Sequence, residues 1–553
     1  MIRIEQMKIP HPEGRESFME KIEKTLGVKK AEVLSYEIRK HSIDARKKPC
    51  LFHIYTVDVE VREEARILRK LLKKGKGGHI SYVEQKEVDA YCAVPCGEEA
   101  LTGRPAIIGT GPAGLFCGYE LARMGYRPIL LERGMDVDSR IKDVKDFWEG
   151  GALKAESNVQ FGEGGAGTFS DGKLNTLTKD RGGRNREVLR LFAAHGAPRE
   201  ILYESKPHIG TDILADVVKN IRGSIQQMGG EVRFHTKVTD ILTFTEGGVE
   251  RLTGLIVLDT VSGKESVLPA SVAVFAIGHS ARDTFSMLEK RHVHMEAKSF
   301  AVGVRVEHPQ ALIDRAQYGR EARDGLPAAA YKLAANLESG RGVYTFCMCP
   351  GGYVVNASSE EGRIAVNGMS YSARDGRNAN SAVIVTVTPE DYKAFGDGPL
   401  AGICFQRRLE EAACLEGEGS VPAQRFADFQ KGVPSSGGGS VSPQIKGSYT
   451  WGNVRRIFPG ALAEALEEGI LEFDKKIPGY ASKDTVVTGV ESRTSSPVRI
   501  RRDENMESSI KGLYPCGEGA GYAGGITSSA ADGLKVAETV SRKYCPFDKE
   551  GLS

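Results

Sequence analysis

A glycine-rich turn near residue 110 constrains the fold of this chain more than any other feature. Three glycines in the spacing GxGxxG (Gly109, Gly111 and Gly114) follow a short apolar segment and precede a helical pattern, a second apolar segment and Glu132. This order is typical of a βαβ unit that binds a dinucleotide, because glycines allow the sharp turn and the close approach of the backbone to a pyrophosphate. The sequence therefore predicts a Rossmann-like domain rather than an ordinary glycine-rich turn.

Each part of this unit has an expected contact with the dinucleotide. Pro112 suits the first helical turn, because the amide hydrogen that it lacks has no partner there. The free amides of that turn would face the phosphates, and Glu132 would accept hydrogen bonds from both ribose hydroxyls. The predicted contacts of the unit are Gly109, Gly111, Pro112, Ala113, Gly114, Glu132 and Arg133.

The far end of the chain indicates which dinucleotide is bound. Residues 513–537 contain a short apolar segment, a Gly-Glu turn and a helical segment rich in small residues. They resemble the closing motif of flavoproteins of the glutathione-reductase-like and hydroxybenzoate-hydroxylase-like superfamily. The resemblance implies FAD, bound noncovalently, with Gly517 and Glu518 at the ribityl chain. It also implies that Gly524, Gly525 and Ile526 bring backbone amides to the isoalloxazine ring.

Segments in the middle of the chain fit the same superfamily. The apolar run that ends at Gly278 resembles the superfamily's strand that ends in Ala/Thr-x-Gly, and the strand that contains Val238 resembles the one whose valine backbone contacts adenine. A second GxGxxG lies at residues 162–167, but no apolar strand precedes it and no packing helix follows, so we do not expect a second nucleotide fold. In related flavoproteins this segment lies along the flavin, which implies contacts from Gly164, Gly165, Gly167 and Thr168.

Taken over its whole length, the chain resembles the uncharacterised bacterial FAD-dependent dehydrogenase family, a distant relative of the geranylgeranyl reductases. The segments particular to this resemblance are residues 161–172, 346–352, 495–497 and 517–525. The resemblance implies electron transfer through a flavin and assigns no substrate.

Composition narrows the class of protein further. The formal net charge of +2 over 553 residues provides no field that would attract nucleic acid or a membrane. No segment has the roughly 20 apolar residues of a membrane span, and the N-terminus has no signal-peptide core. Ten scattered cysteines favour reduced thiols over a disulfide framework, so we expect a cytoplasmic protein.

The pattern of apolar residues predicts an α/β protein with four segments. Residues 1–100 show the order βαββαβ of a ferredoxin-like module, residues 101–295 and 481–553 form the two parts of the FAD-binding domain, and residues 296–480 form an inserted antiparallel β-rich cap over the substrate. For the nearly neutral N-terminal module we favour a docking or lid role, with RNA binding as the alternative. A glycine- and serine-rich loop in the insertion is either a lid or a spacer.

The candidates for catalysis are less specific than those for FAD. Lys173 lies in a glycine-rich segment for which a solvated turn is favoured, and the alternative is that it lines the substrate side. Arg493 would hold an anionic substrate, although a structural salt bridge is favoured. Cys347 and Cys349 lie two apart on a predicted strand, so packing on one face is favoured over redox chemistry, and metal binding is the weakest alternative. We expect no metal site.

We therefore expect an FAD-dependent oxidoreductase that transfers hydride to or from flavin N5 with an unidentified small-molecule substrate. The alternatives are an FAD monooxygenase and a flavoprotein linked to RNA modification through its N-terminal module. Only one GxGxxG follows a strand, so NAD(P)H would act as a transient electron donor without a domain of its own. The sequence does not identify an electron-transfer partner.

Overall fold

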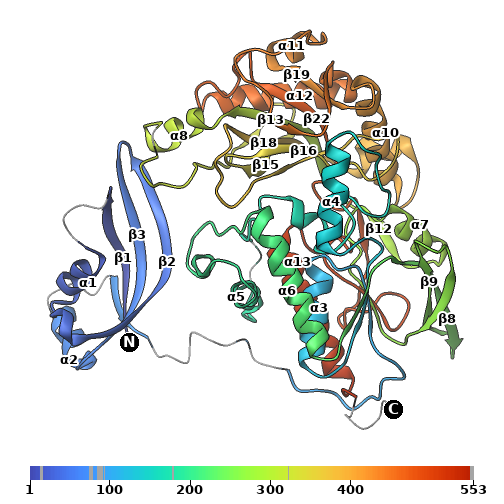
Figure 1. The fold of residues 1–553 in the computed structure, drawn as a ribbon, viewed down its shortest axis with the longest axis horizontal. Coiled ribbons are helices and arrows are strands. Elements are labelled where there is room, and N and C mark those ends of the chain that lie inside the picture. The colour runs from blue at the N-terminus through green and yellow to red at the C-terminus, as the bar shows by residue number, and fades with distance from the viewer. Residues whose placement is uncertain are drawn as a thin grey trace.

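The computed structural model describes residues 1–12, 17–73, 79–83, 91, 94–176, 178, 180–321 and 323–547. Figure 1 shows three parts: an N-terminal module in blue, a central α/β part that contains α3, α6 and α13, and a cap above it that contains β13, β15, β18 and β22. No helix in the described part of the chain is both long and apolar enough to cross a bilayer.

The N-terminal module has the predicted order of elements. Its sheet runs β2-β3-β1-β4, and helices α1 and α2 bury Ile22, Leu26, Ile67 and Leu71 in a core with the strands. Ser17 caps α1, because its side chain accepts a hydrogen bond from the Glu20 amide while Glu20 bonds back to the Ser17 amide. The elements are β1 (Ile2–His11), α1 (Phe18–Leu26), β2 (Val33–Lys47), β3 (Cys50–Val61), α2 (Glu64–Lys73) and β4 (Ile80–Tyr82).

The hairpin of β2 and β3 attaches this module to both other parts. The His41 amide donates to the Tyr203 carbonyl at 2.8 Å, and the Ser205 amide donates to the His41 carbonyl at 2.9 Å. The His41 ring lies 2.5 Å from a carboxylate oxygen of Glu204. Leu51, at the tip of the hairpin, is buried in the hydrophobic core of the cap. The module is therefore docked on the molecule rather than only tethered to it.

The central part is built on a parallel sheet in the order β24-β11-β5-β6-β7. Its strands are short and apolar because both faces are covered. Helices α3, α6 and α13 lie side by side in Figure 1 and share one hydrophobic core, whereas β8, β9 and α7 contribute to the core of the opposite face. The strands are β5 (Ala106–Ile108), β6 (Ile129–Leu131), β7 (Glu231–Arg233), β8 (Thr236–Glu246), β9 (Val249–Asp259), β10 (Glu265–Pro269), β11 (Ala273–Phe275) and β24 (Leu513–Pro515), and the helices are α3 (Pro112–Arg123), α4 (Val137–Trp148), α5 (Arg184–Ala194), α6 (Thr211–Gln227), α7 (Arg282–Lys290) and α13 (Ile526–Lys543).

The cap is formed by a seven-stranded sheet in the order β14-β15-β18-β13-β22-β19-β21, with smaller sheets β17-β16-β20 and β12-β23 beside it. Its main pairs are antiparallel, although β19 and β21 are parallel. The elements are β12 (Met295–Ala297), β13 (Phe300–Pro309), α8 (Gln310–Tyr318), β14 (Ala334–Asn336), β15 (Gly342–Cys349), β16 (Tyr353–Asn356), β17 (Val366–Met369), β18 (Asn378–Val387), α9 (Pro389–Tyr392), α10 (Ala401–Glu416), β19 (Val421–Arg425), α11 (Phe426–Lys431), β20 (Ile445–Lys446), β21 (Tyr449–Trp451), α12 (Gly460–Asp474), β22 (Val486–Glu491) and β23 (Val498–Ile500).

One predicted boundary is wrong. We expected the cap to end at residue 480, but β22 pairs with β13 and β19 inside the cap sheet. The cap therefore continues to Glu491. The apolar pattern of β22 gave no indication of which sheet the strand joins, because partners distant in sequence decide that.

Gly303 tests the packing of the cap sheet. A Cβ atom at this position in β13 would lie 2.0 Å from the carbonyl oxygen of Val383 in β18. We expect Gly303→Ala to destabilise the cap by about 1–3 kcal/mol, as overpacking of a core does. Thermal unfolding measures this. The control is Gly342→Ala in β15, where no heavy atom lies within 4 Å of the added Cβ; equal melting temperatures for the two variants would contradict the packing.

Candidate functional site

A cavity of about 340 Å³ lies between the central sheet and the cap. Its lining comes from segments far apart in the sequence: the turn after β5, residues 160–175, the end of β11, the end of β15, residues 491–494 and the start of α13. Because parallel strands end at the same edge of a sheet, the turns that follow β5, β11 and β24 meet there. The cavity therefore collects the glycine-rich segments that the sequence predicts to bind FAD.

The three glycines after β5 differ in what an added Cβ atom would contact. Gly109 has a φ of 97°, and a Cβ on it would lie 2.5 Å from the Ala276 carbonyl oxygen. A Cβ on Gly114 would lie 1.9 Å from the Gly109 carbonyl oxygen, so these two glycines are required by the protein itself. At Gly111, the N-cap of α3, the nearest atom to an added Cβ is the Gly165 Cα at 3.8 Å. That space fits the approach of a phosphate group to the start of the helix.

Glu132 is buried directly after β6, and all its hydrogen bonds in the structure are to the protein. One carboxylate oxygen accepts from the amide and hydroxyl of Thr110, at 3.0 and 2.7 Å. The other accepts from the amides of Gly134 and Gly162, at 3.0 and 3.1 Å. Glu132 thus joins the two glycine-rich loops, a role that the sequence did not suggest. Its predicted contact with ribose stays a prediction.

A group of charges surrounds the expected adenosine end. The Arg133 guanidinium forms ion pairs with Asp283 and Glu156 and lies 4.5 Å from the centre of the Phe161 ring. Lys237 pairs with the same two carboxylates, each at 2.7 Å. Burial alone would raise the pKa of Asp283, but Arg133 and Lys237 hold it below its usual value. Val238 lines the cavity beside Lys237, where the sequence places it.

Arg140 of α4 holds the loop at residues 162–169 in place. This fully buried guanidinium donates hydrogen bonds to backbone carbonyls of the loop and of the segment before it, with distances of 2.7–3.2 Å, and its acceptors are Asn158, Val159, Gly162, Glu163 and Gly165. Gly165–Phe169 forms a short 3-10 helix, and the next α-helix among the described residues is α5. Gly165 and Gly167 line the cavity, whereas Gly164 and Thr168 lie behind it.

The closing segment completes the opposite wall. Gly524 and Gly525 precede α13, and no atom lies within 4 Å of a Cβ added to either one. The same holds at Gly278, whose φ is 67°. Glu518 lines the cavity, and its Oε1 lies 3.2 Å from Nδ1 of His279, while its predicted contact with the ribityl chain stays a prediction. Gly517 lies nearby, and its amide donates to Asp532.

His279 was not predicted from the sequence. It is 8% exposed, lines the cavity, and its Nε2 has no hydrogen-bond partner in the described part of the chain. Its position directly after Gly278, at the carboxyl end of a parallel strand, is the signal that could have found it. A buried imidazole nitrogen at a cavity wall can hold or pass a proton.

The cap side of the cavity contains the catalytic candidates. Lys173 is 33% exposed and lies 3.8 Å from Asp171, which is buried and paired with Arg374. Arg493 lines the cavity, but its guanidinium donates to both oxygens of Glu410, at 3.0 Å each. The favoured prediction of a structural salt bridge at Arg493 is confirmed.

The cysteine pair lies at the end of β15, but the strand is not regular there. The pairing with β18 shifts register between Phe346 and Cys349, and Cys347 has a φ of 42°. Simple alternation therefore does not apply, and Cys347 lines the cavity while Cys349 is buried. No group of three or more metal-ligating side chains is found among the described residues.

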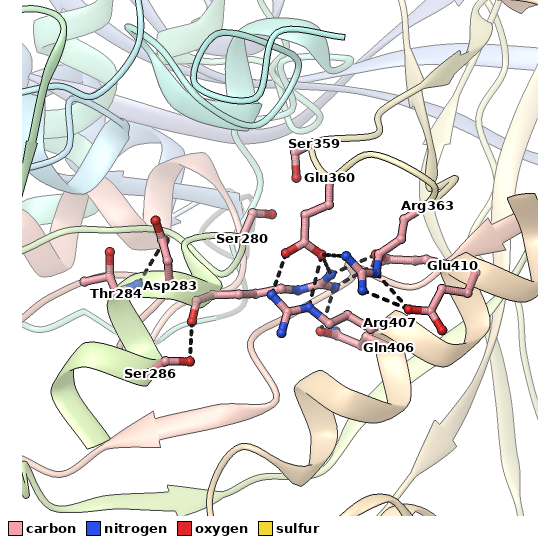
Figure 2. A network of polar contacts seen from close by, with 12 residues as sticks. Ser280, Asp283, Thr284, Ser286, Ser359, Glu360, Arg363, Gln406, Arg407 and Glu410 are labelled. Atoms are coloured by element: carbon pink, nitrogen blue, oxygen red, sulfur yellow. Dashed lines mark hydrogen bonds and ion pairs between the residues drawn. The ribbon is translucent and has the colours of Figure 1, made fainter. Parts of the chain in front are cut away.

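A buried network of ion pairs fixes the cap on the central part. Figure 2 shows Glu360, Arg407 and Glu410 gathered beside α7, whose Arg282 bonds to Glu360 at 2.7 Å and to both oxygens of Glu410 at 2.8 Å. Burial alone would raise the pKa of Glu360, but Arg407 and Arg282 lower it to about 2. The network therefore favours ionised carboxylates between the two parts.

Glu360 gives a prediction with a definite pH dependence. Because its pKa is lower in the folded than in the unfolded protein, its charge stabilises the fold above the unfolded value of about 4.3, and this stability disappears as the pH falls towards 2. We expect Glu360→Gln to lower the melting temperature at pH 7, with a cost of about 1–3 kcal/mol. The difference from the wild type should shrink at pH 3. The exposed neighbour Glu361→Gln is the control, and a difference that does not change with pH would contradict the network.

Two solved enzyme structures show a loose similarity to this chain. Glycerol-3-phosphate dehydrogenase from Bacillus halodurans, complexed with FAD, is 12% identical with a TM-score of 0.36, covering 80% of this chain and 65% of that one. Glycine oxidase from Bacillus cereus is 12% identical with a TM-score of 0.32, covering 79% of this chain and 94% of that one.

Sequence comparisons are more specific. Residues 299–494 match the family described as "FAD-dependent protein, C-terminal domain-like", which coincides with the cap, and residues 1–60 match a domain of unknown function, DUF8436. An uncharacterized protein of Clostridium beijerinckii is 47% identical over 548 residues, which cover 98% of this chain and 99% of that protein. The chain therefore belongs to the family of this Clostridium beijerinckii protein, and its cap is similar to the FAD-dependent protein C-terminal domain.

Proposed function

We propose that this protein is an FAD-dependent oxidoreductase that binds FAD noncovalently and acts on a small molecule beneath the cap. The observation that carries the proposal is the meeting of two distant glycine-rich turns, residues 109–114 and 517–526, at one cavity. An added Cβ would meet no atom within 4 Å at Gly524 and Gly525 and would only touch the Gly165 Cα, at 3.8 Å, at Gly111, whereas it would clash with the protein at Gly109 and Gly114. Glycines that the fold itself does not require support the close approach of a ligand.

Different residues of the cavity would bind different parts of FAD. The start of α3 would hold the pyrophosphate, Glu132 and Val238 the adenosine, and Glu518 the ribityl chain. The start of α13, at Ile526, would lie at the pyrimidine edge of the flavin, where a helix N-terminus favours negative charge. The absence of a second Rossmann unit in the described part of the chain supports NAD(P)H as a transient donor rather than a resident cofactor.

FAD bound in this way would accept or donate a hydride at its N5 atom. The protein itself positions the substrate and handles protons. The cap, fixed by Arg282 and Glu410, covers the substrate side of the cavity. His279 and Lys173 are side chains at the wall that can hold or release a proton near the substrate. We place the enzyme in the cytoplasm, where thiols such as its unpaired cysteines stay reduced.

Gly111→Val tests the FAD site. Its side chain would occupy the space expected for the pyrophosphate, so we expect the purified variant to contain less than about a tenth of the flavin of the wild type. Flavin released by acid precipitation and identified by chromatography measures this, and the wild type should release FAD rather than FMN. Gly223→Val in α6, where an added Cβ meets no atom within 4 Å, is the control. Full flavin content in Gly111→Val would refute the assigned site.

The class of reaction is tested by an anaerobic screen of small molecules that bleach or restore the flavin absorbance. We expect a reductant and an oxidant of the flavin, and at most slow consumption of oxygen by the reduced enzyme. Rapid oxygen consumption coupled to hydroxylation would favour a monooxygenase instead. Crosslinking of RNA to residues 1–100 would favour the RNA-linked alternative.

A further inference from the structure

Cys347 and Cys349 form a pair of thiols with unequal access to the cavity. The register shift in β15 turns Cys347 towards the cavity wall, beside Lys173, while Cys349 is fully buried behind it. The φ of 42° at Cys347 lies in a region that residues other than glycine rarely adopt. Such backbone strain persists only where the surrounding structure holds it, and it is concentrated at functional sites.

Arg305 of β13 holds this strained segment. Its guanidinium is fully buried and donates from Nη1 and Nη2 to the Cys347 carbonyl, at 3.2 Å each. Nη1 also lies 3.8 Å from Sγ of Cys349. The Nε atom donates to Glu491 at 2.9 Å, which anchors the guanidinium from the neighbouring strand β22. The two cysteines thus lie beside the Arg305 guanidinium, whose position is fixed by its hydrogen bonds.

The electrostatic environment treats the two thiols differently. A hydrogen bond from Cys349, together with the charges of Arg305 and Lys173, lowers the pKa of Cys347 to about 5, against the effects of burial and of Asp171. Burial raises the pKa of Cys349, and its hydrogen bond to Cys347 and the charge there raise it further. These effects favour the thiolate at Cys347, which lines the cavity, over the thiolate at Cys349.

A stabilised thiolate has a consequence for redox equilibrium. Whatever stabilises the reduced form of a thiol pair makes its disulfide a stronger oxidant. A disulfide between residues two apart also closes a small ring, and strained disulfides are more oxidising. Both effects favour the same direction of reaction, in which the disulfide takes electrons from other thiols.

We propose that Cys347 and Cys349 form a redox-active pair that oxidises thiol substrates in the cavity. In this reaction a substrate thiolate attacks Sγ of Cys347 and displaces Cys349, which takes up a proton. A second substrate thiolate then attacks the substrate sulfur of the mixed disulfide and displaces Cys347 as a thiolate. The two substrate thiols lose two electrons and become a disulfide, and the cysteine pair gains both electrons.

The inference rests on the proposed function in one respect, because the oxidant that restores the cysteine disulfide is FAD, which takes up the two electrons. In the absence of turnover, an added diamide reagent is an equivalent two-electron oxidant. The thiol chemistry can therefore be tested separately from the flavin.

The first test uses alkylation of the full-length protein with iodoacetamide, followed by mass spectrometry of the peptides. We expect Cys347 to react at pH 6 at least about ten times faster than the exposed Cys404, because the thiolate is the reactive species. Lys173→Gln should shift the pH profile of Cys347 upwards, and the exposed Lys332→Gln should leave it unchanged. A Cys347 profile that rises only near pH 8.5 would overturn the proposal.

The second test follows the disulfide itself. After diamide treatment, we expect Cys347 and Cys349 to be linked within one peptide and then reduced by a monothiol, with one disulfide of the thiol formed per pair. Cys349→Ser should keep the fast alkylation of Cys347 but form no internal disulfide. If diamide produces no Cys347–Cys349 link in the wild type, the proposal is wrong.

The third test joins the pair to the flavin. Anaerobic addition of a dithiol should bleach the flavin of the wild type at least about ten times faster than that of Cys347→Ser. Equal rates would overturn the proposed electron transfer from the cysteine pair to the flavin. A protein that carries no flavin but passes the alkylation and disulfide tests would refute the proposed function alone, so the two failures can be told apart.

Discussion

The position of the cap on the central part depends on the ion pairs of the Glu410 carboxylate. This carboxylate is fully buried in α10 and accepts hydrogen bonds from Arg282 of the central part, and from Ser492 and Arg493 at the end of the cap. A buried charge costs several kcal/mol to desolvate unless its geometry is well satisfied, and here each oxygen has partners. Burial alone would raise the pKa of Glu410, and the two arginines hold it well below its usual value. These ion pairs hold α10 of the cap against α7 of the central part.

The sequence was most informative where function needs residues close together in the chain. The unit from β5 to Glu132 and the turn around Glu518 were predicted correctly in place, because glycine spacing and apolar strands are local signals. The order βαββαβ predicted for residues 1–100 also appears in the structure. Periodicity is enough to identify such elements, since each buries one face or both.

The residues that organise the site were not predictable in the same way. Arg140, Arg305 and Glu410 are charged side chains whose partners lie between 18 and 186 positions away, so nothing in their immediate sequence marks them as buried. Their roles follow only from tertiary contacts. For the same reason, the bulge that separates Cys347 from Cys349 could not be inferred from their spacing, which suggested a regular strand.

The packing of α13 on α3 determines when the cavity can form during synthesis of the chain. A Cβ on Gly533 would lie 2.2 Å from the Ala113 carbonyl, so the last helix fits tightly against the first helix of the central part. The two walls of the cavity thus come from segments separated by more than 400 residues of chain. During synthesis the ribosome must deliver α13, at residues 526–543, before the second wall exists. A ligand that needs both walls would therefore find its complete site only after this helix has been made.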